Sequence, residues 1–247
     1  MKRRSFLAGI GALLAGGCSK LAETAPVSSL LRSAEDWNRH VHNLLGRERG
    51  ALAREYAPED VSPFFRGNGT TEPDSSAYRA HAAADFADWR LSVGGLVATP
   101  LSLSLAELKA LPQRSQITRH DCVEGWSAIG QWKGPQLSRL LEMAGLRSEA
   151  RYIVFRCADR LYGADYYESI DLIDAFHPQT IVAHELNGQP LPVLNGAPLR
   201  MRIERQLGYK HAKYLTGIEA VASLDGIAGG KGGYWEDRGK YQWYAGI

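Results

Sequence analysis

Residues 120–126 read His-Asp-Cys-Val-Glu-Gly-Trp, and this stretch decides how the rest of the sequence is interpreted. It follows a predicted strand near residues 116–119, so Cys122 would stand just past a strand, where a thiol can enter a cleft. A thiolate is a strong ligand for a soft or borderline metal. One cysteine does not make a zinc site, and the chain has neither a Cys-x-x-Cys nor a His-x-x-x-His pattern. A metal bound by Cys122 would therefore take its other ligands from a group that is not protein.

The cysteine count leaves other roles open for Cys122. If Cys18 belongs to a processed N-terminus, only Cys122 and Cys157 remain, and in an oxidising compartment they either pair or are protected. A disulfide would close a loop of 34 intervening residues and stabilise the fold by about 3 to 4 kcal/mol on the chain-entropy estimate. A cysteine hydrolase with a histidine base is also conceivable, although spacing alone does not support it. The histidines in question are His120, His184 and His211.

A second group of residues combines glycine turns with basic side chains. It comprises residues 195–200 (NGAPLR) and 208–213 (GYKHAK). Arg200 offers a forked donor suited to phosphate, and Lys210, His211 and Lys213 add cations and donors, so an anion could bind here. The alternative is a surface hairpin whose basic side chains are solvated. On spacing alone the hairpin is the simpler interpretation.

The first 17 residues are expected to be an export signal rather than part of the fold, because a basic start precedes a short apolar run. The pair Arg3-Arg4, followed by Ser5-Phe6-Leu7, resembles a twin-arginine signal, which exports proteins that are already folded. An ordinary secretory signal is the alternative. Residues 14–18 resemble a lipoprotein box with an extra glycine, which predicts a periplasmic protein anchored to a membrane through Cys18. A soluble periplasmic protein cleaved elsewhere remains the other possibility.

The remainder predicts one α+β domain with a mixed sheet. The net charge is +2 and no basic run occurs, which argues against a nucleic-acid surface. Residues 18–56 are expected to form a linker and a helix near 33–45, and residues 57–247 the domain, which opens with an irregular passage over 57–80.

Beyond residue 80, short strands and helices follow in mixed order, without the regular alternation of a parallel sheet. Strands are predicted at 89–93, 101–103, 116–119, 152–157, 166–170, 181–186, 199–203 and 213–222. Short helices are predicted after Ser104, at 135–144 and at 171–176. Asn187-Gly188 predicts a hairpin turn, and residues 229–247 form a glycine-rich, aromatic tail.

An ordered set of motifs resembles a known family. The motifs are CVEGW with a following W-x-G, YYESIDL, LNGQPLP, NGAPLR and LGYKHAKY. Together they resemble the molybdopterin-binding domain of the sulfite oxidase family, above all its exported bacterial branch, which includes catalytic subunits of periplasmic methionine sulfoxide reductases. The likeness runs from about Phe64 to Val221. It implies a mixed α+β fold that carries a molybdenum–molybdopterin cofactor.

The resemblance also implies site residues. Cys122 matches the cysteine that ligates molybdenum beside the pterin. Residues that would hold the pterin and its phosphate are Asn68, Asn195, Arg200, His211, Ala212 and Lys213. Cys157 matches a threonine or serine beside the cofactor in relatives, which makes it a pocket-lining thiol in the cofactor site and weakens the disulfide interpretation.

Two polar residues are expected to face the pocket as proton donors or substrate-orienting groups. They are Glu124, two residues after the cysteine, and Tyr167, in the YYES run. Each has a plainer alternative. Glu124 could only satisfy backbone donors, and Tyr167 could be a strand residue that packs on an apolar face.

One departure from the family pattern bears on the substrate. Sulfite-oxidising relatives place an arginine and a histidine on either side of the loop asparagine, whereas this chain has Gly67 and Gly69 beside Asn68. Without that cation, binding of a dianion such as sulfite should be weak. The expected reaction is therefore a two-electron oxo transfer that reduces an S-oxide or N-oxide, small or protein-bound. A sulfite dehydrogenase is one alternative, and a non-catalytic lipoprotein with a Cys122–Cys157 disulfide is another.

The likeness also bears on partners. Nothing in the sequence indicates a flavin, an iron–sulfur cluster or a heme, so a separate redox partner is expected to supply electrons. The resemblance implies that this partner is a membrane heme protein. The dimer domain of sulfite-oxidising relatives is not recognisable, which predicts a monomer.

Overall fold

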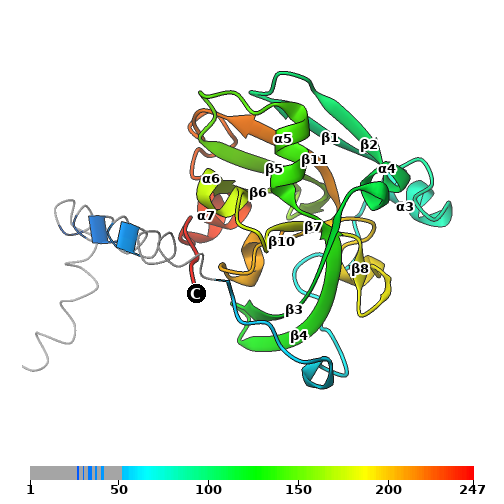
Figure 1. The fold of residues 1–247 in the computed structure, drawn as a ribbon. Coiled ribbons are helices and arrows are strands. Elements are labelled where there is room, and N and C mark those ends of the chain that lie inside the picture. Colours follow the sequence, from blue (N-terminus) through cyan, green and yellow to red (C-terminus); the bar gives the residue numbers. More distant parts are fainter. Residues whose placement is uncertain (1–26, 28–29, 31–32, 35–36, 38–39, 42–51) are drawn as a thin grey trace, which may run out of the picture. The chain divides into compact units, whose positions relative to one another are not determined.

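The computed structural model describes residues 52–247 and, before them, residues 27, 30, 33–34, 37 and 40–41 (Figure 1). The chain divides into two units, Met1–Ala51 and Leu52–Ile247. All described residues of the first unit are helical, and those at 33–41 fall within the predicted helix. The predicted export signal, Cys18 and most of the predicted linker lie outside the described residues. Within the part that is described, no helix is long and apolar enough to cross a membrane.

The second unit is built on a mixed five-stranded sheet of order β2-β1-β11-β5-β6. β1 runs parallel to β11, and the other neighbours are antiparallel. The bounds are β1 Arg90–Gly95, β2 Leu101–Ser104, β5 Tyr152–Leu161, β6 Ala164–Asp171 and β11 Leu215–Val221. The predicted strands in these regions and the α+β class are confirmed. The unit begins at Leu52, slightly before the predicted start at Ala57, because Ala53 exchanges backbone hydrogen bonds with the Gln179 side chain.

Two helices form where local sequence signals place them. In α4 (Leu105–Ala110), Ser104 and Glu107 form the predicted reciprocal cap. In α5 (Leu137–Ala144), the four apolar residues of one face are fully buried against the sheet, and Gly145 ends the helix at φ 69°. Pro135 belongs to the preceding strand and not to the first turn of α5, since Gln136 is the N-cap.

The long hairpin of β3 (Gln113–Cys122) and β4 (Trp126–Pro135) extends away from the five-stranded sheet (Figure 1). The sequence did not predict β4, because Gly130 and Gly134 resemble strand breakers. The structure explains both glycines by close approach: a Cβ on Gly134 would lie 2.0 Å from the Val182 carbonyl oxygen, and one on Gly130 2.9 Å from Leu186.

Shorter strands complete this layer. β8 (Glu185–Leu186) pairs with β4 and β9 (Gln189–Pro190), while β7 (Ile181–Ala183) pairs with β10 (Arg200–Arg202). Asn187 and Gly188 join β8 to β9 with φ 53° and 74°, which confirms the predicted hairpin turn.

Two regions expected to be irregular contain helices. η1 (Pro58–Asp60) and α3 (Ser76–Ala83) interrupt the predicted irregular passage at 57–80, and the Ser75 hydroxyl caps α3 by accepting from the Tyr78 N–H. The tail contains α7 (Tyr234–Gly239). The other short helices are α6 (Leu172–Ala175), η2 (Val193–Asn195) and η3 (Gly208–Lys210).

Replacing Gly134 with alanine should destabilise the protein by about 2 kcal/mol or more, because the added Cβ would overlap backbone atoms of β7 that cannot turn aside. Urea unfolding measures the effect. Gly94→Ala in β1 is the matched control, since no atom lies within 4 Å of its added Cβ, and its stability should not fall. Equal unfolding midpoints for the two variants would contradict the close approach of β4 and β7.

Candidate functional site

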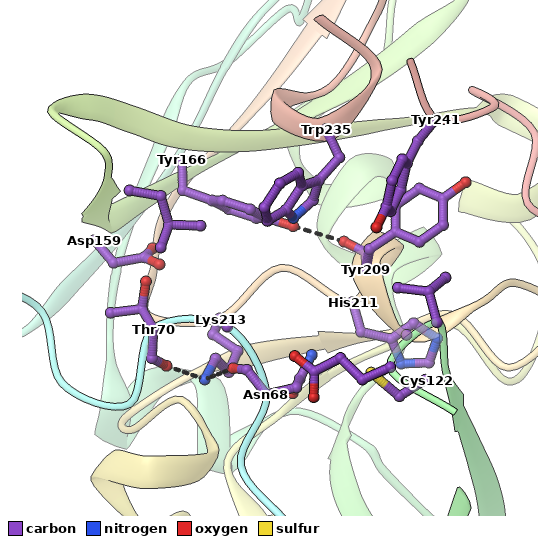
Figure 2. Close-up of a pocket in the computed structure, with 15 residues that line it drawn as sticks. Asn68, Thr70, Cys122, Asp159, Tyr166, Tyr209, His211, Lys213, Trp235 and Tyr241 are labelled. Atoms are coloured by element: carbon purple, nitrogen blue, oxygen red, sulfur yellow. Dashed lines mark hydrogen bonds between the residues drawn. The ribbon is translucent and has the colours of Figure 1, made fainter. Parts of the chain in front are cut away.

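A cavity of about 220 Å³ lies among segments far apart in the sequence (Figure 2). The loop at residues 68–70 and the tip of the β3–β4 hairpin line one side, together with His211 and Lys213. The remaining lining of the cavity comes from β5, β6, η3 and the C-terminal segment. The lining residues in these elements include Asp159, Leu161, Tyr166, Tyr209, Trp235 and Tyr241.

Local geometry brings Cys122 to this cavity. Cys122 is the last residue of β3 and pairs with Trp126, so three residues make the turn. The Gly125 N–H donates to the Cys122 carbonyl at 3.0 Å, and Gly125 has φ +85°, the left-handed position that such turns require. Burial raises the pKa of the Cys122 thiol, so a metal ion would have to displace its proton.

Glu124 also lines the cavity, as predicted from its place in the motif. Its side chain is solvent-exposed, and one carboxylate oxygen accepts the Trp126 indole N–H at 2.9 Å. The carboxylate therefore stands at the tip of the hairpin beside the thiol of Cys122.

A buried polar network supports the strand that carries Cys122. The Arg202 guanidinium donates to His120 Nδ1 at 2.9 Å and forms a 2.6 Å ion pair with Glu204. Glu204 also accepts from Gln116 at 2.8 Å, which links β10 to β3. Burial lowers the pKa of His120 well below its usual range, so this ring is a neutral acceptor. The network holds β3 in place behind the thiol.

Lys213 is a buried cation held by backbone oxygens. Its Nζ donates to the carbonyls of Asn68 at 2.7 Å and Leu194 at 3.2 Å, and to that of Thr70 (Figure 2). Burial lowers the pKa of Lys213 to about 7. A bound anion beside Lys213 would restore its charged form.

Arg200 is a second buried cation, located behind the cavity. It is fully inaccessible and donates to the carbonyls of Asn195 at 3.0 Å and His211 at 3.4 Å. Burial lowers the pKa of Arg200 to about 9. Within residues 52–247, no carboxylate forms an ion pair with Arg200 or Lys213. The acids with the largest effect on them, Glu204 for Arg200 and Asp159 for Lys213, act only from a distance.

Several buried polar atoms around the cavity have no hydrogen-bond partner in the protein, although buried polar groups normally have one. His211 illustrates the pattern: its Nε2 donates to the Gln206 carbonyl at 3.0 Å, which leaves Nδ1 as an unpaired acceptor. The atoms are Asn68 Oδ1, Thr70 Oγ1, Asp159 Oδ1, Arg200 Nε and His211 Nδ1. Such a set of donors and acceptors fits a polar heterocycle with an anionic arm.

The described residues contain no cluster of three histidine, cysteine or acidic side chains that could hold a metal ion. That the other ligands of a metal at Cys122 come from the bound group itself stays a prediction. The donors around the cavity fit a pterin with its phosphate, and the thiol fits a metal at its edge.

Asp159 is an acid in the cavity that the sequence did not indicate. It lies in β5 beside Thr70 and is almost fully buried (Figure 2). Burial raises the pKa of Asp159 to about 6. A carboxyl group with this pKa can hold or release a proton near neutral pH.

The residues predicted from the sequence fall into groups. Those that line the cavity are Asn68, Cys122, Glu124, His211 and Lys213. Those that are buried but do not line it are Asn195, Arg200 and Ala212. Cys157 lies in β5 next to the apolar core and does not line the cavity, and both Cys122 and Cys157 are free, so the alternative disulfide is not formed.

The expected position of Tyr167 is corrected. Its hydroxyl donates to Asp237 at 2.5 Å, and its side chain does not line the cavity. The neighbouring Tyr166 does, and its hydroxyl donates to the Tyr209 carbonyl at 2.8 Å (Figure 2). Successive strand residues point to opposite faces, so the YYES motif was right about the strand and wrong about which tyrosine faces the cavity.

Comparisons with known proteins agree with this geometry. The model of the family "Oxidoreductase molybdopterin binding domain" matches residues 78–225. The chain is 37% identical, over its full length and 86% of the relative, to an Azospira oryzae protein named as protein-methionine-sulfoxide reductase subunit YedZ1. It is 35% identical to the protein-methionine-sulfoxide reductase catalytic subunit MsrP of Xanthomonas axonopodis, over 67% of this chain and 55% of that protein.

A solved structure supports the fold alone. The sulfane dehydrogenase SoxCD of Paracoccus pantotrophus superposes with a TM-score of 0.52 over 56% of this chain and 39% of that chain, at 21% identity. The mixed α+β architecture is thus shared with a known enzyme.

Asp159→Asn should stabilise the cofactor-free protein increasingly as the pH rises from 4 to 7. The unfolded carboxyl ionises near pH 4, whereas the folded one keeps its proton to about pH 6. The parent therefore loses stability across this window, by about 2 to 3 kcal/mol in total, and the asparagine does not. Urea unfolding at several pH values measures the difference.

Asp74→Asn is the matched control, because the Asp74 side chain is 97% exposed. Its difference from the parent should stay near zero over the same pH range. A gap between Asp159→Asn and the parent that narrows with rising pH would contradict a buried, protonated carboxyl.

Proposed function

The chain belongs to the family of oxidoreductases with a molybdopterin-binding domain, and from this we propose that it reduces S-oxides, with methionine sulfoxide as the first candidate. The resemblance predicted from the motifs is confirmed, and with it the enzyme class and the molybdenum–molybdopterin cofactor. The observation that carries the S-oxide substrate is the 37% identity, over the full chain, to a protein named for methionine sulfoxide reduction. The unpaired buried polar atoms near Cys122 support the cofactor.

We assign the metal bond to the Cys122 thiolate and the pterin contacts to residues around the cavity. Asn68, His211 and Lys213 face the cavity, while Arg200 and Asn195 supply charge and support from behind it. Ala212 is buried in the apolar core between the cavity residues His211 and Lys213, and its contact with the group stays a prediction. When bound, the molybdenum–pterin group supplies two-electron oxo transfer. The protein binds it, orients the substrate and provides protons.

Proton delivery follows from the acids at the cavity. A sulfoxide that takes up electrons and protons releases its oxygen as water, so a proton source must lie near the substrate. Asp159 has a pKa of about 6 through burial, and Glu124 stands beside Cys122. We assign proton supply to these two carboxyl groups, in place of the predicted Tyr167.

Sulfite oxidation is the weaker candidate. Sulfite-oxidising relatives place an arginine where this chain has Gly67, and a side chain there would have to displace Leu194, since an added Cβ would lie 2.3 Å from Leu194 Cδ1. Gly69 has φ +56°, a conformation that disfavours a larger side chain. The loop is therefore built around glycine at both positions.

The setting of the enzyme is part of the proposal. The chain spans about half the length of MsrP from Xanthomonas axonopodis, whose name marks it as a catalytic subunit that acts on protein methionine sulfoxide. We infer that this chain likewise acts in the periplasm as a catalytic subunit, with a membrane heme protein as electron donor. We further propose that the protein is a monomer and is anchored to a membrane by a lipid on Cys18.

Cys122→Ser should lose most of its molybdenum and its activity, because a serine hydroxyl replaces the thiolate that binds the metal. The parent, expressed with its N-terminal segment, should contain about one molybdenum per chain on the single-site assignment. Elemental analysis and reduction of methionine sulfoxide with an artificial electron donor measure the two effects.

Cys157→Ser is the matched control, since this second free cysteine lies outside the cavity lining, and it should retain metal. Parent protein without molybdenum or pterin would overturn the assignment. Rapid turnover of sulfite at micromolar concentration, with none of S-oxides, would replace it with a sulfite dehydrogenase.

A further inference from the structure

The C-terminal segment, residues 226–247, lies beyond the part of the chain that matches the family model and yet forms part of the cavity. Two of its aromatic residues line the cavity: Trp235 in α7 and Tyr241 just after it. Figure 2 shows both rings on the side of the cavity that faces Cys122 and Asn68. We call Trp235, Tyr241 and the adjoining Tyr209 the aromatic wall.

The aromatic wall is a continuous surface of rings. Trp235 and Tyr241 stack with centroids 5.5 Å apart at 22°, and Tyr241 meets Tyr209 edge-on at 5.0 Å. The Tyr209 hydroxyl donates to the Gln242 carbonyl at 2.6 Å, which ties the ring to the segment. The wall therefore offers aromatic faces and edges to whatever enters the cavity.

Buried charges hold this segment in place. The Lys210 ammonium lies 2.7 Å from Glu168 and 2.6 Å from Glu236, and all three side chains are buried. Tyr167 adds its 2.5 Å hydrogen bond to Asp237. Because Glu236 and Asp237 belong to α7, these contacts fasten α7 to β6 and η3. The wall is a preformed part of the site, and Tyr167 acts in holding it.

The two sides of the cavity differ in chemistry. The cation Lys213 and the unpaired atoms of Asn68 and His211 lie on the side of Cys122, where the cofactor is assigned. The aromatic wall presents no charged group to the cavity. Aromatic rings attract thioether sulfur and polarised methyl groups, and their negative faces repel an inorganic oxyanion.

We propose that Trp235 and Tyr241 determine substrate specificity by contacting the methylthio end of a methyl sulfoxide, free or within a peptide. The sulfoxide oxygen is thereby directed toward the Cys122 side of the cavity. This inference rests on the proposed function. It adds the residues that select the S-methyl end of the substrate.

Trp235→Ala and Tyr241→Ala holoenzymes should show KM values about three- to tenfold higher than the parent, the effect expected for loss of one aromatic contact. Their kcat and molybdenum content should stay within about twofold. The probes are N-acetylmethionine sulfoxide amide and a short peptide that contains methionine sulfoxide. Tyr241→Phe keeps the ring and should retain the parent KM.

Tyr162→Ala is the control, because Tyr162 is an aromatic residue 86% exposed and outside the cavity lining. Binding of the product thioether, N-acetylmethionine amide, to each holoenzyme by calorimetry adds a readout that does not depend on turnover. It should weaken in the two alanine variants and not in Tyr162→Ala. Should Trp235→Ala fail to fold, Tyr241→Ala, whose ring is partly exposed, still tests the wall.

The outcomes separate the two proposals. Unchanged KM and unchanged thioether binding in both alanine variants would overturn the specificity role while S-oxide reduction by the parent stands. A rise in KM for the peptide alone would place the contacts on the peptide chain and also overturn it. A molybdenum-loaded parent that reduces no S-oxide would remove the proposed function, and this inference with it.

Discussion

Two cations buried without carboxylate partners constrain the region around the cavity. Lys213 and Arg200 are held by backbone carbonyls, and burial lowers the pKa of both. Burying an unpaired charge costs free energy that a folded protein normally avoids. The carbonyls of Asn68, Thr70, Leu194 and Asn195 stabilise these cations only in part. The remaining positive potential is available to an anionic cofactor.

The same fold pairs its other buried cations fully. Among the described residues, the buried Arg202 pairs with Glu204 and the buried Lys210 with two glutamates, while the partly buried Arg205 pairs with Asp174. The difference lies in function, since the paired cations join structural elements whereas the unpaired ones face or support the cavity. Arg202 steadies the strand of Cys122, and Lys210 anchors the C-terminal segment. Buried cations with a carboxylate partner thus stabilise the structure around the site, whereas those without one are assigned to cofactor binding.

The sequence by itself determined the features that depend on neighbouring residues. The CVEGW motif predicted a cysteine at a strand end, and the turn forms because Gly125 adopts the left-handed conformation. The cap of α4 at Ser104 and the Asn187-Gly188 turn are equally local. The ordered motifs also identified the family and its cofactor, because they preserve the residue types that a shared site requires.

Only the tertiary structure decided which side chains meet. The sequence did not predict β4, because its two glycines are explained only by close contacts with strands that are distant in the sequence. Local strand propensity carries no information about such contacts. The sequence analysis chose the wrong one of two adjacent tyrosines, since the choice depends on which face of β6 turns toward the cavity. Asp159, Trp235 and Tyr241 carry no motif, and they reach the cavity because β5 and the C-terminal segment pack beside it. Their chemistry arises from burial and proximity, which exist only after the chain has folded.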